Sequence, residues 1–395
     1  MKVPITKVDL NENIKDAVGA VLESGWLVQG ANVAKFEQMF AEYSGAEYAV
    51  AVTSCTTALH LSLEAMGIKR GDRVLLPSFT YVASANSIEQ TGAVPVFCDI
   101  DLKTFNLSVE KMREIKDIDF IMPVNLFGLC ADMVSVSQFA SERGIKVIED
   151  SACGLGAYID GKHSGTFGDA GCFSFHPRKA ITTGEGGIVV TNDEEIARKL
   201  RVKRDHGASK SDLQRHFEKG GSLLPEFNES GFNYRMTDIQ GVIGVCQMAE
   251  ADGILEKRAL LAERYNEALK ESSFILPSVP EGYVHGYQSY VLIWNEGRTV
   301  DELEKLPISE IEQLNRNRNK FMFELENRGI ATRQGTHAVH TLGFYKEKYG
   351  LSDEDYKSSF TADRLSFALP LYPSMTDKEF EYVCSNIYEV LNCAE

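Results

Sequence analysis

Several classes of protein are excluded by what this chain of 395 residues lacks. Its eight cysteines are scattered, with no C-x-x-C pair and no cluster of cysteine with histidine, so their spacing offers neither a zinc site nor an iron–sulfur site. A disulfide scaffold is not expected in a chain of this length. Reduced thiols in a cytoplasmic protein are therefore the better interpretation of the cysteines.

Positive charge and long apolar runs are scarce as well. The chain has 41 lysines and arginines against 57 acidic residues, a formal net charge of −16. Surfaces that bind nucleic acid or anionic membranes carry positive patches, so neither is an expected partner. No apolar run approaches the roughly 20 residues of a membrane helix, and the N-terminal residues lack the apolar core of a signal peptide. We expect a cytoplasmic protein of two or three domains.

Short apolar runs alternate with helical patterns through the first 250 residues. This alternation predicts an α/β fold around a parallel, doubly wound sheet, in which ligands bind beyond the carboxyl ends of the strands. The runs are residues 48–52, 94–97, 120–124 and 146–148. Residues suited to chemistry follow or end the predicted strands: Thr56, Tyr81, Asn125 and Asp150.

A single lysine, Lys179, lies on a glycine-rich loop between two predicted strands, residues 170–173 and 188–191. Loops on a rigid scaffold often carry catalytic groups, but on its own Lys179 is equally compatible with an ordinary surface lysine. Asp150 is open to two interpretations in the same way. An acid at the end of a strand either caps the next helix or meets a positive group at the ligand edge.

Two segments near the N-terminus have features of a ligand site. Small hydroxyl residues from Thr53 to Thr57 stand between a strand and a helix, where free N–H groups and the helix dipole favour a phosphate. Ser and Thr are also common helix caps, so both interpretations stay open. The turn from Ser24 to Gly30 could hold Trp26 near a ligand, although on the turn alone a helix end with a packed tryptophan is favoured.

The C-terminal third has a different pattern. A long helix at 254–269 leads into a strand at 287–294 and a helix at 320–328, and a capping box at residues 376–379 opens the final helix. We predict a large domain over residues 1–250 and a smaller α+β domain over 251–395. The segment 210–229 has weak periodicity and predicts a mobile loop.

Taken in order, these segments resemble the fold-type I aminotransferases that depend on pyridoxal 5′-phosphate (PLP), and most closely the sugar aminotransferase family often named DegT/DnrJ/StrS. The resemblance implies a large domain with a mostly parallel sheet of seven strands, flanked by helices, and a smaller α+β domain. It covers nearly the whole chain and rests on SGWLVQG, SCTTALHL, PSFTYVASAN, GAVPVFCDID, EDSACGLGA, SFHPRKAITTGEGG, GFNYRMTDIQ and SFALPLYPSMT.

The resemblance also implies roles for individual residues. Lys179 would form a Schiff base with the cofactor and later carry protons, and Asp150 would pair with the pyridine nitrogen. A homodimer with shared active sites is implied as well. The remaining cofactor contacts would be Cys55, Thr56, Thr57 and Ser174 at the phosphate, Tyr81 and Ala152 on the two ring faces, Cys153 near the phenolic oxygen, and Asn233 from a second subunit.

Four positions depart from the family's pattern. Cys55 replaces a usual glycine and narrows the space for the phosphate, and Cys153 replaces a usual glutamine or histidine, which are better hydrogen-bond partners. Asn125 replaces a usual histidine, and the segment 333–340 replaces a common tyrosine/proline segment. The last two departures concern the substrate pocket.

The function implied is transfer of an amino group from glutamate to a keto-sugar, most often a nucleotide-linked keto-deoxysugar for cell-surface polysaccharide or glycoconjugate synthesis. Alternatives are a free acidic sugar, such as an 8-oxo-3-deoxy-octulosonate of lipopolysaccharide, and a PLP-dependent sugar dehydratase, against which Lys179 argues. A non-catalytic regulator of the same fold is disfavoured by the complete set of cofactor residues. The candidate substrate residues are Trp26, Arg178, Arg333, His337 and His340.

Overall fold

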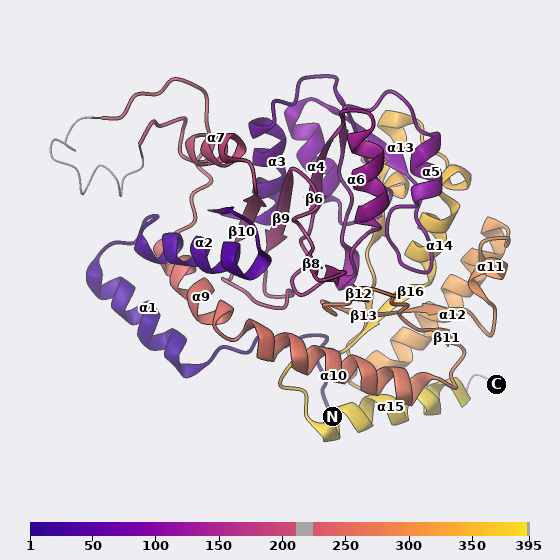
Figure 1. Cartoon of the computed structure of the whole chain (residues 1–395). Coiled ribbons are helices and arrows are strands. Elements are labelled where there is room, and N and C mark those ends of the chain that lie inside the picture. The colour runs from indigo at the N-terminus through magenta and orange to yellow at the C-terminus, as the bar shows by residue number, and fades with distance from the viewer. Residues whose placement is uncertain (211–223, 393–395) are drawn as a thin grey trace.

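The larger of the two main sheets has seven strands, in the spatial order β1-β10-β9-β6-β5-β2-β4. The computed structural model describes residues 1–210 and 224–392 (Figure 1). Neighbouring strands run parallel from β9 to β4, whereas β10 is antiparallel to both of its neighbours. The predicted mostly parallel α/β sheet is confirmed. The strands are β1 (Tyr48–Val52), β2 (Arg73–Pro77), β4 (Val94–Cys98), β5 (Phe120–Ile121), β6 (Lys146–Asp150), β9 (Ala170–Ser174) and β10 (Gly187–Thr191).

Helices cover both faces of this sheet, because alternate residues of a strand point to opposite sides. In β1, Val50 packs in one core with α3 and α4, whereas Ala49 and Ala51 pack in another core with α2 and α9. A third core joins α6 to the central strands. These helices are α2 (Ala31–Ser44), α3 (Cys55–Ala65), α4 (Ala83–Thr91), α6 (Met133–Ser141) and α9 (Asp238–Met248).

A smaller antiparallel sheet, in the order β11-β13-β16-β14, lies in the C-terminal third. The helix predicted at 320–328 begins much earlier, at Ile308, and Pro307 precedes it in an extended conformation. Thr376 and Glu379 form the predicted capping box. Figure 1 shows α10 and α15 side by side below this sheet. The elements are α10 (Ala251–Leu269), β11 (Phe274–Ile275), β13 (Tyr290–Trp294), α12 (Ile308–Asn327), β14 (Arg333–Gln334), β16 (Ser366–Leu369) and α15 (Asp377–Asn392).

The strand predicted at 287–294 starts only at Tyr290. Tyr287 has a φ of 43°, in the left-handed region that residues other than glycine seldom adopt, so the chain enters β13 through a bend. Of the predicted loop at 210–229, residues 211–223 lie outside the described residues. Further elements are α1 (Glu12–Ser24), α5 (Val109–Glu114), α7 (Glu194–Arg204), α11 (Val300–Leu303), α13 (Gly343–Tyr349) and α14 (Lys357–Leu365).

Two short strand pairs join the C-terminal third to earlier parts of the chain. β15 (His337–Ala338) pairs with β3 (Phe79–Thr80), and β12 (Tyr283–Val284) pairs with β7 (Tyr158–Ile159), which in turn pairs with β8 (Lys162–His163). The domain boundary at residue 250 stays a prediction. Among the helices described, none is long and apolar enough to cross a membrane.

Candidate active site

Asp150 and Lys179 come together at the carboxyl edge of the larger sheet. Asp150 is the last residue of β6, and it lies opposite Cys172 of the neighbouring parallel strand β9, which leads into the lysine loop. A small cavity opens beside this loop. Four of the predicted cofactor residues line it: Ala152, Cys153, Ser174 and Lys179.

The lysine loop, residues 175–186, is closed by main-chain hydrogen bonds. The N–H of Phe175 donates to Gly186 O at 2.9 Å, and Phe175 O accepts from the N–H of Thr183 at 3.0 Å. Within the loop, the N–H of Lys179 donates to His176 O at 2.8 Å. The loop therefore presents Lys179 on a fixed turn between β9 and β10, as the strand–loop–strand prediction requires.

The lysine amine has a thiol and a carboxylate as neighbours. Lys179 Nζ lies 3.1 Å from Cys153 Sγ and donates to it. Burial lowers the pKa of Lys179, but Cys153, Cys55 and Asp150 act in the opposite direction, and the balance raises the pKa above the usual lysine value. Without a ligand, the amine is therefore held as an ammonium group by its surroundings.

The carboxylate of Asp150 is buried, with 5% of its surface exposed. One oxygen accepts from Ser84 Oγ at 2.7 Å, and the other accepts from the N–H of Ala152 at 3.1 Å. Burial raises the pKa of Asp150, whereas these two donors and the nearby Lys179 oppose the rise. A buried carboxylate at the carboxyl edge of the sheet, close enough to Lys179 to act on its charge, is suited to pair with a protonated ring nitrogen, so it fits the pyridine nitrogen of PLP.

The start of α3 offers a site for the phosphate. Ser54 caps the helix by accepting from the N–H of Thr57 at 3.2 Å. The N–H groups of Cys55 and Thr56 have no acceptor among the described residues, and they lie at the positive end of the helix dipole. Gly187 of β10 packs against this turn so closely that a Cβ there would lie 2.4 Å from Ser54 C. Main-chain atoms therefore form this site, and its free N–H groups fit a phosphate group.

The side chain of Cys55 lies close to the lysine. It is buried, and Cys55 Sγ lies 3.6 Å from Cys172 O in β9. Cys55 is also among the groups that raise the pKa of Lys179. Its predicted narrowing of the space for the phosphate stays a prediction.

Three other predicted cofactor and ligand residues do not line the cavity. Tyr81 is 64% exposed just before α4, and Asn233 is exposed as well. Trp26 is half-buried, and its indole N–H donates to Gln29 O at 3.3 Å, as a packed tryptophan in a turn would. Their cofactor and substrate roles stay predictions.

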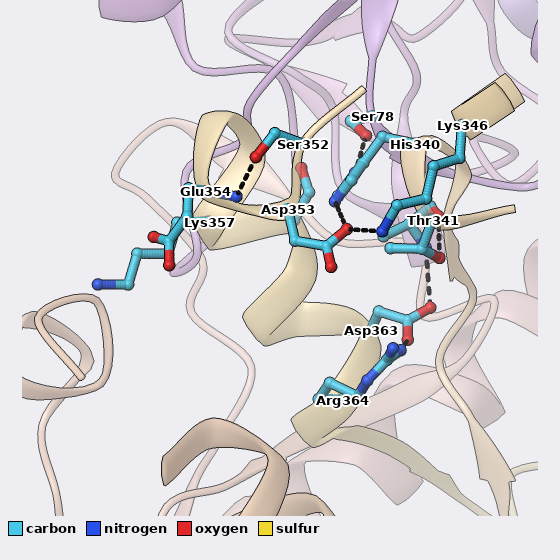
Figure 2. Close-up of polar contacts among 12 residues, drawn as sticks. Ser78, His340, Thr341, Lys346, Ser352, Asp353, Glu354, Lys357, Asp363 and Arg364 are labelled. Carbon is cyan, nitrogen blue, oxygen red and sulfur yellow. Dashed lines mark hydrogen bonds and ion pairs between the residues drawn. The ribbon is translucent and has the colours of Figure 1, made fainter. Parts of the chain in front are cut away.

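The candidate substrate cations fall into two groups. Arg178, Arg333 and His337 are exposed, whereas His340 is fully buried. Figure 2 shows His340 between two side chains: its Nδ1 shares a 2.6 Å hydrogen bond with Ser78 Oγ, and its Nε2 lies 3.8 Å from Asp353 Oδ1. Burial lowers the pKa of His340 to about 4, so it is neutral at pH 7. Its substrate role stays a prediction.

Asn125, which the sequence placed at the substrate pocket, has a different position. It is fully buried and donates to Glu149 Oε2 at 3.0 Å and to Ser151 Oγ at 2.7 Å. Glu149 also accepts three main-chain N–H bonds, from Gly165, Phe167 and Gly168. Asn125 therefore belongs to a buried network behind Asp150, because an amide can both donate to a carboxylate and accept a backbone N–H.

Gln288 is the residue at the cavity that the sequence did not reveal. It lines the cavity with Lys179, and its Nε2 donates to Arg178 O at 2.8 Å. The two residues are 110 positions apart in the chain. A glutamine inside the strand predicted at 287–294 carries no local signal of such a contact.

Comparison with known proteins agrees with this geometry. The DegT/DnrJ/EryC1/StrS aminotransferase family matches residues 8–388. The chain is 34% identical to a GDP-perosamine synthase of Caulobacter vibrioides, with 99% of this chain and 98% of that one covered. It is 34% identical to the spore coat polysaccharide biosynthesis protein SpsC of Bacillus subtilis, covering 96% and 94%. A solved putative sugar aminotransferase from Streptococcus pneumoniae, in its PMP form, is 25% identical with a TM-score of 0.88 and full coverage of both chains.

These matches span nearly the whole chain, and the chain belongs to the DegT/DnrJ/EryC1/StrS aminotransferase family. It is a PLP-dependent sugar aminotransferase with the fold-type I architecture. The predicted family, fold, cofactor and reaction class are confirmed.

Proposed function

We propose that this family member transfers an amino group from glutamate to a nucleotide-linked keto-deoxysugar, for the synthesis of a cell-surface polysaccharide. The observation that carries the proposal is Lys179 at the cavity with the buried Asp150 acting on its charge, in a chain that aligns over nearly its full length with GDP-perosamine synthases. The name of those relatives supports a nucleotide-linked sugar as the amino acceptor.

The residues of the cavity suit the two halves of such a transfer. PLP, when bound, supplies an electron-withdrawing ring that stabilises negative charge on the carbon bearing the amino group. Lys179 would hold the cofactor, and its Nζ, which lies at the cavity, would then carry protons. Asp150 would hold a proton on the ring nitrogen, and the N–H groups of Cys55 and Thr56 would hold the phosphate.

We also propose a homodimer in which Asn233 of each subunit reaches the partner's phosphate site. Asn233 is exposed and does not line the cavity of its own chain, which leaves it available for such a contact. A cytoplasmic location is part of the proposal, supported by the seven free cysteines of the described chain. The dimer predicts that Asn233→Ala weakens PLP binding although this residue lies outside the cavity of its own chain.

The test is a two-step assay with purified protein. Glutamate added to the PLP-loaded protein should bleach the near-visible absorbance and release 2-oxoglutarate, and a nucleotide-linked 4-keto-6-deoxy sugar should then restore the absorbance. Restoration only by a free acidic sugar, such as an 8-oxo-3-deoxy-octulosonate, would replace the proposed acceptor with the alternative. Lys179→Ala should lose the near-visible absorbance, and normal transamination by that variant would refute the assignment of Lys179.

A further inference from the structure

A short segment, residues 286–289, connects the smaller sheet with the lysine loop. It leads into β13, and Gln288 at its centre lines the same cavity as Lys179. The side-chain amide of Gln288 donates to the main-chain carbonyl of Arg178, the residue that directly precedes Lys179. We propose that Gln288 is a positioning residue for Lys179, which it holds in place through the Arg178 carbonyl.

The backbone of this segment has an unusual shape that its surroundings impose. Tyr287 has a φ of 43°, and Phe127, on the chain segment it packs against, has a φ of 57°. Gly128 has a φ of 107°, and a Cβ there would lie 2.7 Å from Tyr287 N, so only glycine allows the two segments to approach so closely. Gly286 N donates to Gly128 O at 2.7 Å. Such conformations persist only where the structure fixes them, and they are frequent at functional sites.

A buried arginine holds the other side of the segment. Arg258 of α10 is 2% exposed, and it donates to Tyr287 O at 2.9 Å from Nε and to Gln288 O at 2.5 Å from Nη2. Burial lowers the pKa of Arg258 to about 10, and no carboxylate within the described residues pairs with it. A buried guanidinium without an ion pair is costly. Its planar fork is suited to two adjacent carbonyls, so it fixes the two peptide groups on either side of the Gln288 Cα.

The fixed segment gives the lysine loop an anchor outside itself. The main-chain bonds that close the loop run between its own residues, such as Phe175 and Gly186. The contact from Gln288 to Arg178 O comes instead from the C-terminal third and reaches the loop one residue before Lys179. Because a small misplacement of a reacting group slows a reaction strongly, loss of this anchor should slow the steps in which Lys179 takes part.

Gln288→Met tests the inference, because methionine has a similar length but cannot donate to the carbonyl. The matched control is Gln313→Met, at an exposed position of α12. For each apo-protein, the rate of covalent PLP capture is followed by near-visible absorbance, and kcat and KM for glutamate are measured on the loaded enzyme. In Gln288→Met we expect the capture rate and kcat to fall roughly fivefold, the factor that corresponds to the free energy of one hydrogen bond. KM for glutamate and Tm should stay close to the wild-type values.

A second variant, Gln288→Glu, keeps the size and polarity of the side chain but removes the donor, and it must show the same loss of capture rate. Capture and kcat equal to those of Gln313→Met would overturn the inference. So would a raised KM with an unchanged kcat, since that would make Gln288 a substrate-binding residue. The inference rests on the proposed role of Lys179, and borohydride reduction of the wild-type holoenzyme tests that role separately. Absence of a pyridoxyl group on Lys179 would refute the proposed function, whereas its presence with normal variants would refute only the inference.

Discussion

The amine of Lys179 lies 3.1 Å from the thiol of Cys153, the residue that the sequence resemblance marks as a replacement for a usual glutamine or histidine. A thiol is a weaker hydrogen-bond partner than either of those side chains, and it is also an ionisable neighbour. The second property links Cys153 to the protonation of the lysine, because Cys153 is among the groups that raise the pKa of Lys179.

Cys153→Ala should therefore lower the pKa of Lys179 in the apo-protein. Only the neutral amine reacts with an acylating reagent, so Lys179 of the variant should be acetylated faster than Lys179 of the wild type at pH 8. The curve of acetylation rate against pH should shift to lower pH. Peptide mass spectrometry after timed acetylation measures this. Cys246→Ala, in α9, serves as the control, and an unchanged profile in Cys153→Ala would contradict the prediction.

Asp150→Asn should separate activity from stability. Burial raises the pKa of Asp150, so the charged carboxylate is unfavourable in the fold, and an isosteric amide should leave the free energy of unfolding unchanged or raise it by about 1 kcal/mol. Loss of the charge that we propose to pair with the ring nitrogen should lower kcat by roughly 10²-fold or more. Urea unfolding and steady-state kinetics on one preparation provide both values. A variant with a lower free energy of unfolding and an unchanged kcat would contradict both the expected stability and the expected loss of activity.

Gly187→Ala tests the phosphate site proposed at the start of α3. An added Cβ would meet the main chain of Ser54 and Cys55 at 2.4 to 2.6 Å, so the start of α3 must shift, at a cost of about 1–3 kcal/mol in stability. The affinity for PLP should fall, which equilibrium titration of the apo-protein measures. The control is Gly19→Ala in α1, where nothing lies within 4 Å and alanine should stabilise the helix by about 0.5–1 kcal/mol.

His340 should contribute to the loss of stability in acid. Its pKa in the folded protein, about 4, lies below the usual histidine value of 6.5, so between these pH values the unfolded chain binds the additional proton. The contribution is present above pH 6.5 and is lost as the pH falls toward 4, with a slope of at most about 1.4 kcal/mol per pH unit. His340→Asn should reduce the fall in unfolding free energy between pH 7 and pH 5, measured with urea. The exposed His337→Asn should retain the wild-type slope.

Much of the fold could be predicted because its signals are local. The strand–loop–strand around Lys179, the helix that starts after Ser54 and the capping box at Thr376 each depend on residues close in the chain. The errors arise where distant segments impose the local conformation. The strand expected from residue 287 starts at Tyr290, because Tyr287 adopts a positive φ that only its tertiary neighbours explain.

The sequence by itself determined the reaction class. It did so through the motifs that resemble the aminotransferase family. Asp150 ends one predicted strand and Lys179 lies on the loop after another, and the carboxyl ends of parallel strands meet at one edge of a sheet. Only the tertiary structure decided which other side chains reach that edge. Gln288 and Arg258 come from segments far along the chain, while Asn125 and His340 are buried by elements that the sequence does not place. Burial and long-range hydrogen bonds arise from packing between distant segments, and no local pattern encodes them.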